Sequence, residues 1–146
     1  MNAKFTQVVE KYLSEAAGLA QEEQHQQLQP LHLAIPMLED PAGIFKQAVI
    51  KASGQDAYAG LMRTLRKRLV RLPRIDPAPD DVFPSKDFSA MLKKAQKLQR
   101  DRGDTYLGAD TLLLALLGDS EIGQLLGEVG IVRNAVETAL KEVRPQ

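Results

Sequence analysis

Residues 31–38 read Leu-His-Leu-Ala-Ile-Pro-Met-Leu, and residues 111–117 read Thr-Leu-Leu-Leu-Ala-Leu-Leu. Each apolar run follows an amphipathic stripe, and each is closed by an acidic stop, Glu39-Asp40 or Gly118-Asp119. The chain therefore repeats one helical pattern twice. A duplicated helical unit that carries no catalytic groups usually builds a binding surface.

The stripes that precede the two runs place apolar residues at i, i+3, i+4 and i+7, which is the spacing of one helix face. They consist of Phe5, Val8, Val9, Tyr12, Leu13, Ala16 and Ala17 in the first copy, and of Phe88, Met91, Leu92, Ala95 and Leu98 in the second. A third helix then ends at Gly54 or Gly130, and a fourth follows. The spacing between matching positions shrinks along the chain, which suggests deletions in loops.

The composition fits one domain over residues 1–146, because 44% of the residues are hydrophobic and 26% are charged. Lys plus Arg equals Asp plus Glu at 19 each, so net charge gives no reason to expect nucleic acid or a membrane as a partner. The chain has no Cys, and no apolar run approaches the roughly 20 residues that cross a bilayer. We expect a cytoplasmic protein.

The periodicity predicts an all-α fold of two pseudo-symmetric four-helix repeats: repeat one over 1–72, a Pro-rich linker over 73–84, and repeat two over 85–146. The expected helices cover 3–21, a segment from Pro30 that Pro36 should kink or end, 44–52, 56–72, a segment capped by Ser85, 110–117, 120–127 and 132–143. The polar tract 21–27 is expected to be a loop.

Candidate catalytic groups are scarce. His25 and His32 are the only histidines, and neither has metal-ligand spacing to an acidic residue. His32 is expected to be a hydrogen-bonded packing residue. The chain has no nucleotide-binding loop and no serine-nucleophile motif, so we expect no enzyme activity, cofactor or metal in it.

The basic run 63–74 has two interpretations. It could bind phosphate groups as a nucleic-acid surface, or it could be a solvated helix face. We favour the solvated face, with internal ion pairs to Asp76, Asp80 and Asp81 as a variant.

Two further features bear on binding. The apolar stripes are core by default, yet two bundles side by side leave a seam that can form an apolar groove for an extended segment. In segment 103–110, Gly103 suits a helix end, and Asp110 lies where a helix N-terminus favours negative charge.

The chain resembles the amino-terminal domain of the Clp family of chaperone and protease unfoldases, and within it the ClpB-type disaggregases with their fungal and other eukaryotic cytosolic relatives. The motifs that carry the resemblance are Gln29-Pro30-Leu31-His32-Leu33, Leu69-Val70-Arg71-Leu72-Pro73, Pro84-Ser85, and Arg102-Gly103-Asp104 with Tyr106 and Asp110.

This resemblance implies a mobile domain that captures unfolded or aggregated polypeptides in an apolar groove of a hexameric unfoldase, whose other modules use ATP and Mg. It implies client-binding roles for Ser85, Leu92, Leu98, Asp104 and Asp110, and aligns a family threonine with Asn2. The isolated domain is expected to be monomeric. Three alternatives stay open: an adaptor-docking module of a protease-coupled unfoldase, a nucleic-acid binder, and a stand-alone repeat protein.

Overall fold

The computed structural model describes residues 4–143, which form eight helices and a pair of two-residue strands. The elements are α1 (Gln7–Glu22), β1 (Gln27–Leu28), α2 (Pro30–Glu39), α3 (Ile44–Ser53), α4 (Gln55–Arg71), β2 (Phe83–Pro84), α5 (Lys86–Arg102), α6 (Ala109–Leu117), α7 (Ser120–Glu128) and α8 (Arg133–Val143). The predicted all-α architecture is confirmed, and most helix ends lie within one or two residues of the predicted ones.

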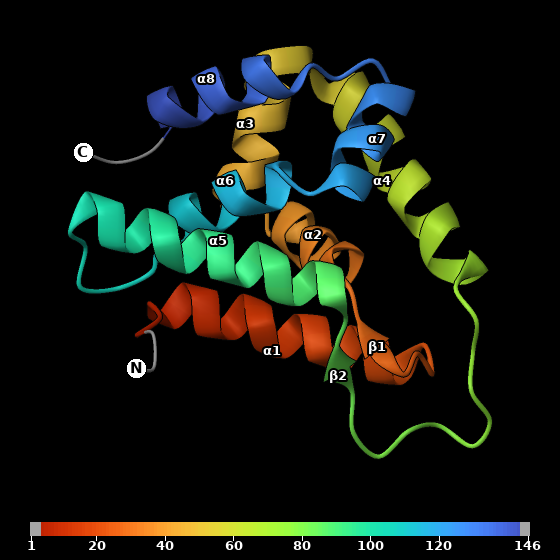
Figure 1. Cartoon of the computed structure of the whole chain (residues 1–146). Helices are drawn as coiled ribbons and strands as arrows, with labels where there is room; N and C mark the ends of the chain where they lie inside the picture. Colours follow the sequence, from red (N-terminus) through yellow and green to blue (C-terminus); the bar gives the residue numbers. More distant parts are fainter. Residues whose placement is uncertain (1–3, 144–146) are drawn as a thin grey trace.

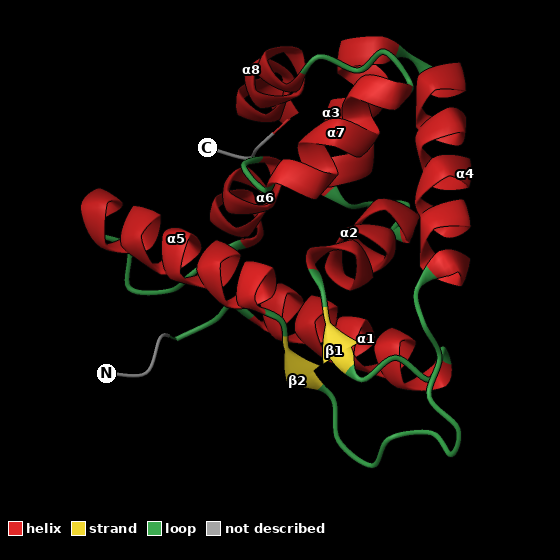
Figure 2. Cartoon of the chain, turned by 45° about the vertical axis from the view of Figure 1, so that its right-hand side comes forward, coloured by secondary structure: helices red, strands yellow, loops and turns green. Residues whose placement is uncertain are grey.

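The two apolar runs form the central helices α2 and α6. Every residue of α2 from Pro30 to Leu38 is buried, as are most residues of α6. Figures 1 and 2 show α1 and α5 along one side of these central helices, with α3, α4, α7 and α8 on the other. A short helix that is apolar all round can lie only inside a protein, so the two runs fix the centre of the fold.

The helices of the two halves share one hydrophobic core. The most extensive helix packing joins α3 to α8, which come from opposite halves of the chain, and α2 also contacts α5 and α7. The halves therefore stabilise each other rather than folding as separate bundles.

We expected Pro36 to kink or end this helix; it does not end α2, which continues to Glu39. A proline inside a helix costs about 3 kcal/mol through one lost hydrogen bond and a steric clash. Its neighbours Ile35, Met37 and Leu38 are each at most 1% exposed. Each such side chain contributes about 2 kcal/mol on burial, so their combined burial outweighs the cost of the proline.

The first helix starts at Gln7, four residues later than predicted, because Thr6 is its N-cap. The Thr6 hydroxyl accepts a hydrogen bond from the Val9 N–H at 3.3 Å. Phe5 lies instead in an extended segment that bridges to Leu107 in parallel. The amphipathic stripe that starts at Phe5 therefore begins in a β-bridge, passes the N-cap Thr6 and only then continues along α1.

The linker is attached to the rest of the molecule at several points. The Ile75 N–H donates to the Gln24 carbonyl at 2.8 Å, and β2 pairs in parallel with β1. Figure 2 shows the linker passing the end of α1 before it reaches β2. The segment 21–27 is therefore more than the loop we predicted, because it ends α1, supplies the first of the two residues of β1 and anchors the linker.

Ser85 caps α5, as predicted, and its hydroxyl accepts a hydrogen bond from the Phe88 N–H at 3.1 Å. We expect Ser85→Ala to lower the free energy of unfolding by about 1 kcal/mol, since one N–H of the first turn loses its partner. Urea denaturation measures this loss. Ser14→Ala is the matched control, because Ser14 is exposed in the middle of α1 and caps nothing. Equal stabilities of the two variants would contradict the capping role.

Candidate functional site

Helix α5 carries or adjoins most of the residues predicted to bind a ligand. Its ends are set by Ser85 at the N-cap and by Gly103 at the C-cap, where φ is 72°. Glycine adopts this left-handed conformation without steric cost, so the predicted helix end at Gly103 is confirmed. A helix of 17 residues is roughly 25 Å long, which places Ser85 and Asp104 at opposite ends of it.

Leu92 and Leu98 lie in the body of α5, and both are half-buried. The fully buried positions of this helix are Phe88, Met91, Ala95 and Gln99. At 3.6 residues per turn, Leu92 and Leu98 point about 120° apart and flank this buried stripe on its two sides. Leu92 packs against the core. The structure therefore does not place the two leucines on the same flank of α5.

Asp104 is exposed in the loop that follows α5. Its backbone N–H donates to the Gln99 carbonyl at 3.1 Å, and the Gln99 side-chain amide donates to the carbonyls of Asp104 and Thr105 at 3.2 and 3.0 Å. The buried Gln99 thus holds the backbone of this loop in place. The exposed Asp104 side chain therefore starts from a backbone position that hydrogen bonds fix.

Asp110 is the second residue of α6, where the helix dipole favours a carboxylate. The Arg102 guanidinium donates to the Asp110 carboxylate at 3.1 Å and to the Thr111 hydroxyl at 3.1 Å. The sequence analysis included Arg102 in a family motif but did not predict its ion pair with Asp110. This ion pair joins the end of α5 to the start of α6. The charge of Asp110 is therefore balanced at least in part, whereas Asp104 adds exposed negative charge.

The start of α1 lies at the same end of the molecule as the α5–α6 loop (Figure 1). The Leu107 N–H donates to the Lys4 carbonyl at 2.7 Å, and the Thr6 N–H donates to the Leu107 carbonyl at 3.1 Å. Val8 and Tyr106 flank this bridge in sequence and are 39% and 53% exposed. We call one set of exposed or half-buried side chains at this end of the molecule the end surface: Phe5, Val8, Leu98, Asp104, Tyr106 and Asp110.

The end surface includes three of the six predicted site residues, namely Leu98, Asp104 and Asp110. Leu92 lies nearer the middle of α5, and Ser85 lies at its far end. Asn2 falls outside the described residues. The predicted residues are thus distributed along α5, and they are densest at its C-terminal end.

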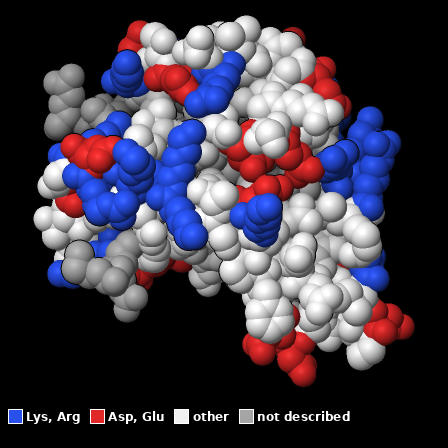
Figure 3. All heavy atoms as spheres, in the orientation of Figure 1, with Lys and Arg blue, Asp and Glu red and all other residues white. Residues whose placement is uncertain are grey.

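Basic side chains gather over α5 and along the outer edge of α4, and acidic ones form a patch near the centre of this face and gather again on the linker (Figure 3). In the basic run, Arg66 pairs with Glu39, and Arg68 pairs with Glu121 at 3.0 Å. The variant interpretation, in which this run pairs with Asp76, Asp80 and Asp81, is wrong for Arg66 and Arg68, since α4 packs against α7 and the linker turns away toward α1. The Arg68–Glu121 pair instead links the two halves of the chain.

His25 and His32 form a buried pair, with 2.9 Å between His25 Nδ1 and His32 Nε2. His32 Nδ1 accepts a hydrogen bond from the Gln29 N–H at 2.9 Å, so its predicted role as a hydrogen-bonded packing residue is confirmed. Burial lowers the pKa of both side chains, and that of His32 falls to about 4, helped by the neighbouring His25. Both imidazoles are therefore neutral near pH 7.

Other kinds of site find no support in the part of the chain that is described. Residues 4–143 contain no cluster of three or more His, Cys, Asp or Glu side chains arranged to hold a metal ion. None of their helices combines the length and the apolar character needed to cross a membrane.

Comparison with known proteins gives a consistent result. Residues 4–129 match the family described as the Clp repeat (R) N-terminal domain. The heat shock protein hsp98 of Neurospora crassa is 35% identical over 157 aligned residues, which cover 97% of this chain and 17% of hsp98. The chaperone protein ClpB of Pseudomonas putida is 31% identical, with 97% of this chain and 16% of ClpB covered. The chain thus spans only 16–17% of the length of these two relatives.

Two solved structures are informative. The crystal structure of the Hsp104 N-terminal domain from Candida albicans is 30% identical and has a TM-score of 0.88, covering 97% of this chain and 91% of that domain. A complex of the ClpV N-domain with a VipB peptide has a TM-score of 0.70 at 16% identity, covering 96% of this chain and 86% of that one. The second likeness concerns the fold alone.

The buried histidine pair predicts a pH-dependent stability. The unfolded chain binds a proton at the ordinary histidine pKa of 6.5, whereas folded His32 binds it only near pH 4. The contribution of the neutral histidines to the free energy of unfolding is therefore fully present above pH 6.5, and it decreases as the pH drops below that value. For His32 the loss approaches about 3 kcal/mol below pH 4. Urea denaturation at a series of pH values measures it.

The matched control for this prediction is His32→Gln. A glutamine at the third helical position can still accept a hydrogen bond from the N–H of the capping residue, but it does not titrate. The carboxyl pKa of Asp40 is lowered mainly by its hydrogen bond from Tyr12, so its contribution falls away only in more acidic solution. Between pH 6.5 and 4.5 the variant should lose less stability than the wild type. Parallel curves would contradict the assignment.

Proposed function

Because this chain belongs to the Clp repeat N-terminal domain family, as a domain of the Hsp104/ClpB type, we propose that it captures unfolded or aggregated polypeptides for a disaggregase. In this proposal the remainder of the parent protein supplies the ATP-driven hexamer, and this domain delivers clients to its pore. The observation that carries the proposal is the end surface, where exposed and half-buried apolar side chains lie at the same end of the molecule as Asp104 and Asp110, on a frame held by hydrogen bonds.

The end surface suits polypeptides that have no fixed shape. Val8 and Tyr106 expose apolar area, and Leu98 adds a half-buried flank of α5. Apolar contact is non-directional and contributes about 25 cal/mol per Å² before the entropic cost of binding, so a small surface binds weakly and reversibly. Weak binding fits a domain that must release each client to the next step.

Rigidity distinguishes this surface from a flexible loop cluster. The Phe5–Leu107 bridge, the Gln99 amide and the Arg102–Asp110 pair each fix one of the segments that form it. A surface that is already ordered loses little conformational entropy on binding. The ClpV N-domain that shares the fold was solved with a VipB peptide, so a helical frame of this kind can hold a peptide.

Charge gives the surface a preference among clients. Asp104 is exposed, and the Asp110 carboxylate is balanced by Arg102, so Asp104 is the acidic group that a basic client residue would meet beside the otherwise basic face of α5. We therefore expect clients in which Lys or Arg lies next to apolar residues. This preference is modest because salt screens exposed charges.

Leu98→Ser tests the apolar part of this proposal. The variant should bind reduced, carboxymethylated α-lactalbumin about fivefold more weakly, because it removes apolar area at the contact. Fluorescence anisotropy of the labelled polypeptide measures the affinity. Val70→Ser is the matched control, since Val70 is 69% exposed on α4, away from the end surface.

Two outcomes would contradict the proposal. Equal weakening by Leu98→Ser and Val70→Ser would show that binding does not use the end surface. Absence of binding to unfolded chains, together with co-purification of one stoichiometric folded protein, would indicate the adaptor-docking alternative instead.

Asp104→Asn tests the electrostatic part. Affinity for an unfolded client rich in Lys should fall about twofold in low salt, and the difference should vanish at 0.5 M NaCl. Asp101→Asn is the control, because Asp101 is exposed nearby but pairs with Lys97 at 2.9 Å. A salt-independent effect of Asp104→Asn would indicate that Asp104 acts through the loop conformation rather than through its charge.

A further inference from the structure

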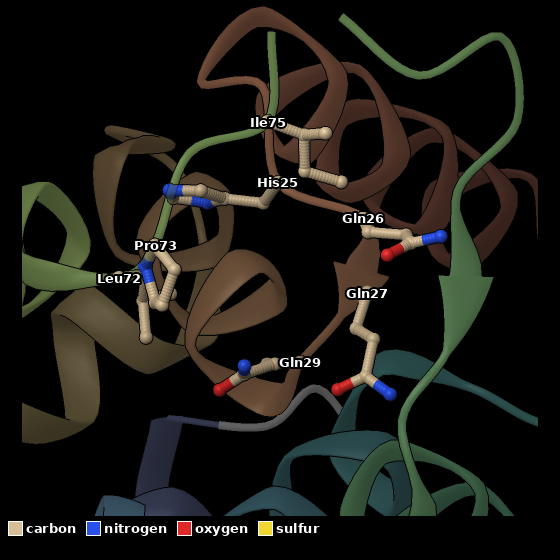
Figure 4. Close-up of a pocket in the computed structure, with 7 residues that line it drawn as sticks. All are labelled: His25, Gln26, Gln27, Gln29, Leu72, Pro73 and Ile75. Atoms are coloured by element: carbon tan, nitrogen blue, oxygen red, sulfur yellow. The ribbon is translucent and has the colours of Figure 1, made fainter.

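A hollow of about 200 Å³ lies beneath the first residues of the linker. Its lining residues are His25, Gln26, Gln27, Gln29, Leu72, Pro73 and Ile75. Figure 4 shows the His25 imidazole directed toward the turn at Leu72 and Pro73, with Gln26 and Gln27 on the opposite side near β2. This hollow adjoins the strand pair and is distant from the end surface, since β2 leads into the N-terminal end of α5.

The hydrogen bonds of the histidine pair determine where the His25 proton lies. His32 Nδ1 accepts from the Gln29 N–H, so the proton of neutral His32 is on Nε2 and is donated to His25 Nδ1. Neutral His25 then carries its own proton on Nε2. The polar chain from Gln29 thus ends in a buried N–H group of His25, which is one of the residues that line the hollow.

This last donor is unsatisfied. His25 is 3% exposed, and its Nε2 has no hydrogen-bond partner among residues 4–143. Buried polar groups in native proteins are paired almost without exception, and a buried donor left without a partner costs free energy. An acceptor that reaches His25 Nε2 from the hollow would satisfy this donor.

We propose that the hollow binds a short uncharged segment of a polypeptide, with a backbone carbonyl oxygen accepting the hydrogen bond from His25 Nε2–H. The described lining holds no Asp, Glu, Lys or Arg, so a charged ligand would lose its hydration without gaining an opposite charge. The glutamine amides can pair with peptide N–H and C=O groups, and Leu72, Pro73 and Ile75 offer an apolar wall to a neighbouring aliphatic side chain.

The hollow of about 200 Å³ is larger than one water molecule, which takes up about 30 Å³ in the liquid, so it has room for a short peptide segment. This inference rests on the proposed function, in which unfolded clients supply such segments. It adds a second contact point, which recognises the peptide backbone rather than apolar area or charge.

The probe for the test is N-acetyl-leucine N-methylamide, the smallest uncharged unit with two carbonyls and an aliphatic side chain. Long-range proton–nitrogen NMR spectra of the labelled chain report His25 Nε2 directly. A saturable shift of this nitrogen, with shifts of the Gln27 and Ile75 amides, is the expected result. N-acetyl-leucine, which carries a free carboxylate, should bind more weakly.

Variants separate the hydrogen bond from the apolar wall. His25→Phe should weaken binding of the probe at least fivefold, because the donor is lost while a ring of similar shape remains. If this variant does not fold, Ile75→Ser keeps the histidine pair and should weaken binding about threefold by removing apolar contact. Leu98→Ser should leave binding of the probe unchanged.

One result overturns this inference. If His25 Nε2 does not shift at 100 mM probe and its proton exchanges magnetisation with bound water, then water is the partner and the hollow binds no peptide. Loss of unfolded-polypeptide binding with intact probe binding would instead contradict the proposed function of the end surface alone.

Discussion

The first turn of α2 is buried with the rest of that helix, and its backbone N–H groups cannot be left to water. The His32 imidazole accepts the N–H of Gln29, the capping residue, from inside the core. A charged imidazole could not perform this task, since both of its nitrogens would be donors. The hydrogen bond therefore requires His32 to be neutral, and the lowered pKa of His32 follows from the same burial.

The other ring nitrogen of His32, Nε2, connects the central helix to residues outside it. It is bonded to His25, which lies just beyond the end of α1. The preceding residue, Gln24, has a φ of 60°, which is uncommon for a residue other than glycine, and its carbonyl accepts the N–H of Ile75 in the linker. The linker then leads to β2, which pairs with β1, and Ser85 comes directly after β2 as the cap of α5. The start of α5 is thus positioned through a chain of contacts that begins in the core.

Local sequence patterns predicted the elements that depend on local physics. The apolar runs indicated α2 and α6, and Ser85 and Gly103 marked the ends of α5 correctly. An end of the helix at Pro36 was predicted because the proline destabilises a helix locally. The stabilisation that outweighs this effect comes from the burial of Ile35 and Leu38 by other helices, which a local pattern does not contain. The Arg102–Asp110 pair joins residues on different elements, and the Phe5–Leu107 bridge joins segments distant in sequence. No spacing rule within one helix reveals such contacts.

The two halves solve the same problem with different side chains. When the apolar runs are superposed so that Pro36 matches Ala115, His32 matches Thr111, and both are at most 1% exposed. In the first half the buried polar group bonds to uncharged His25, whereas in the second Thr111 accepts from Arg102, which also pairs with Asp110. The first arrangement leaves a neutral donor at a hollow, and the second leaves acidic groups beside exposed apolar ones. A single duplicated helix start has therefore produced two surfaces with different chemistry, and in the two proposals made for them each surface recognises a different property of an unfolded chain.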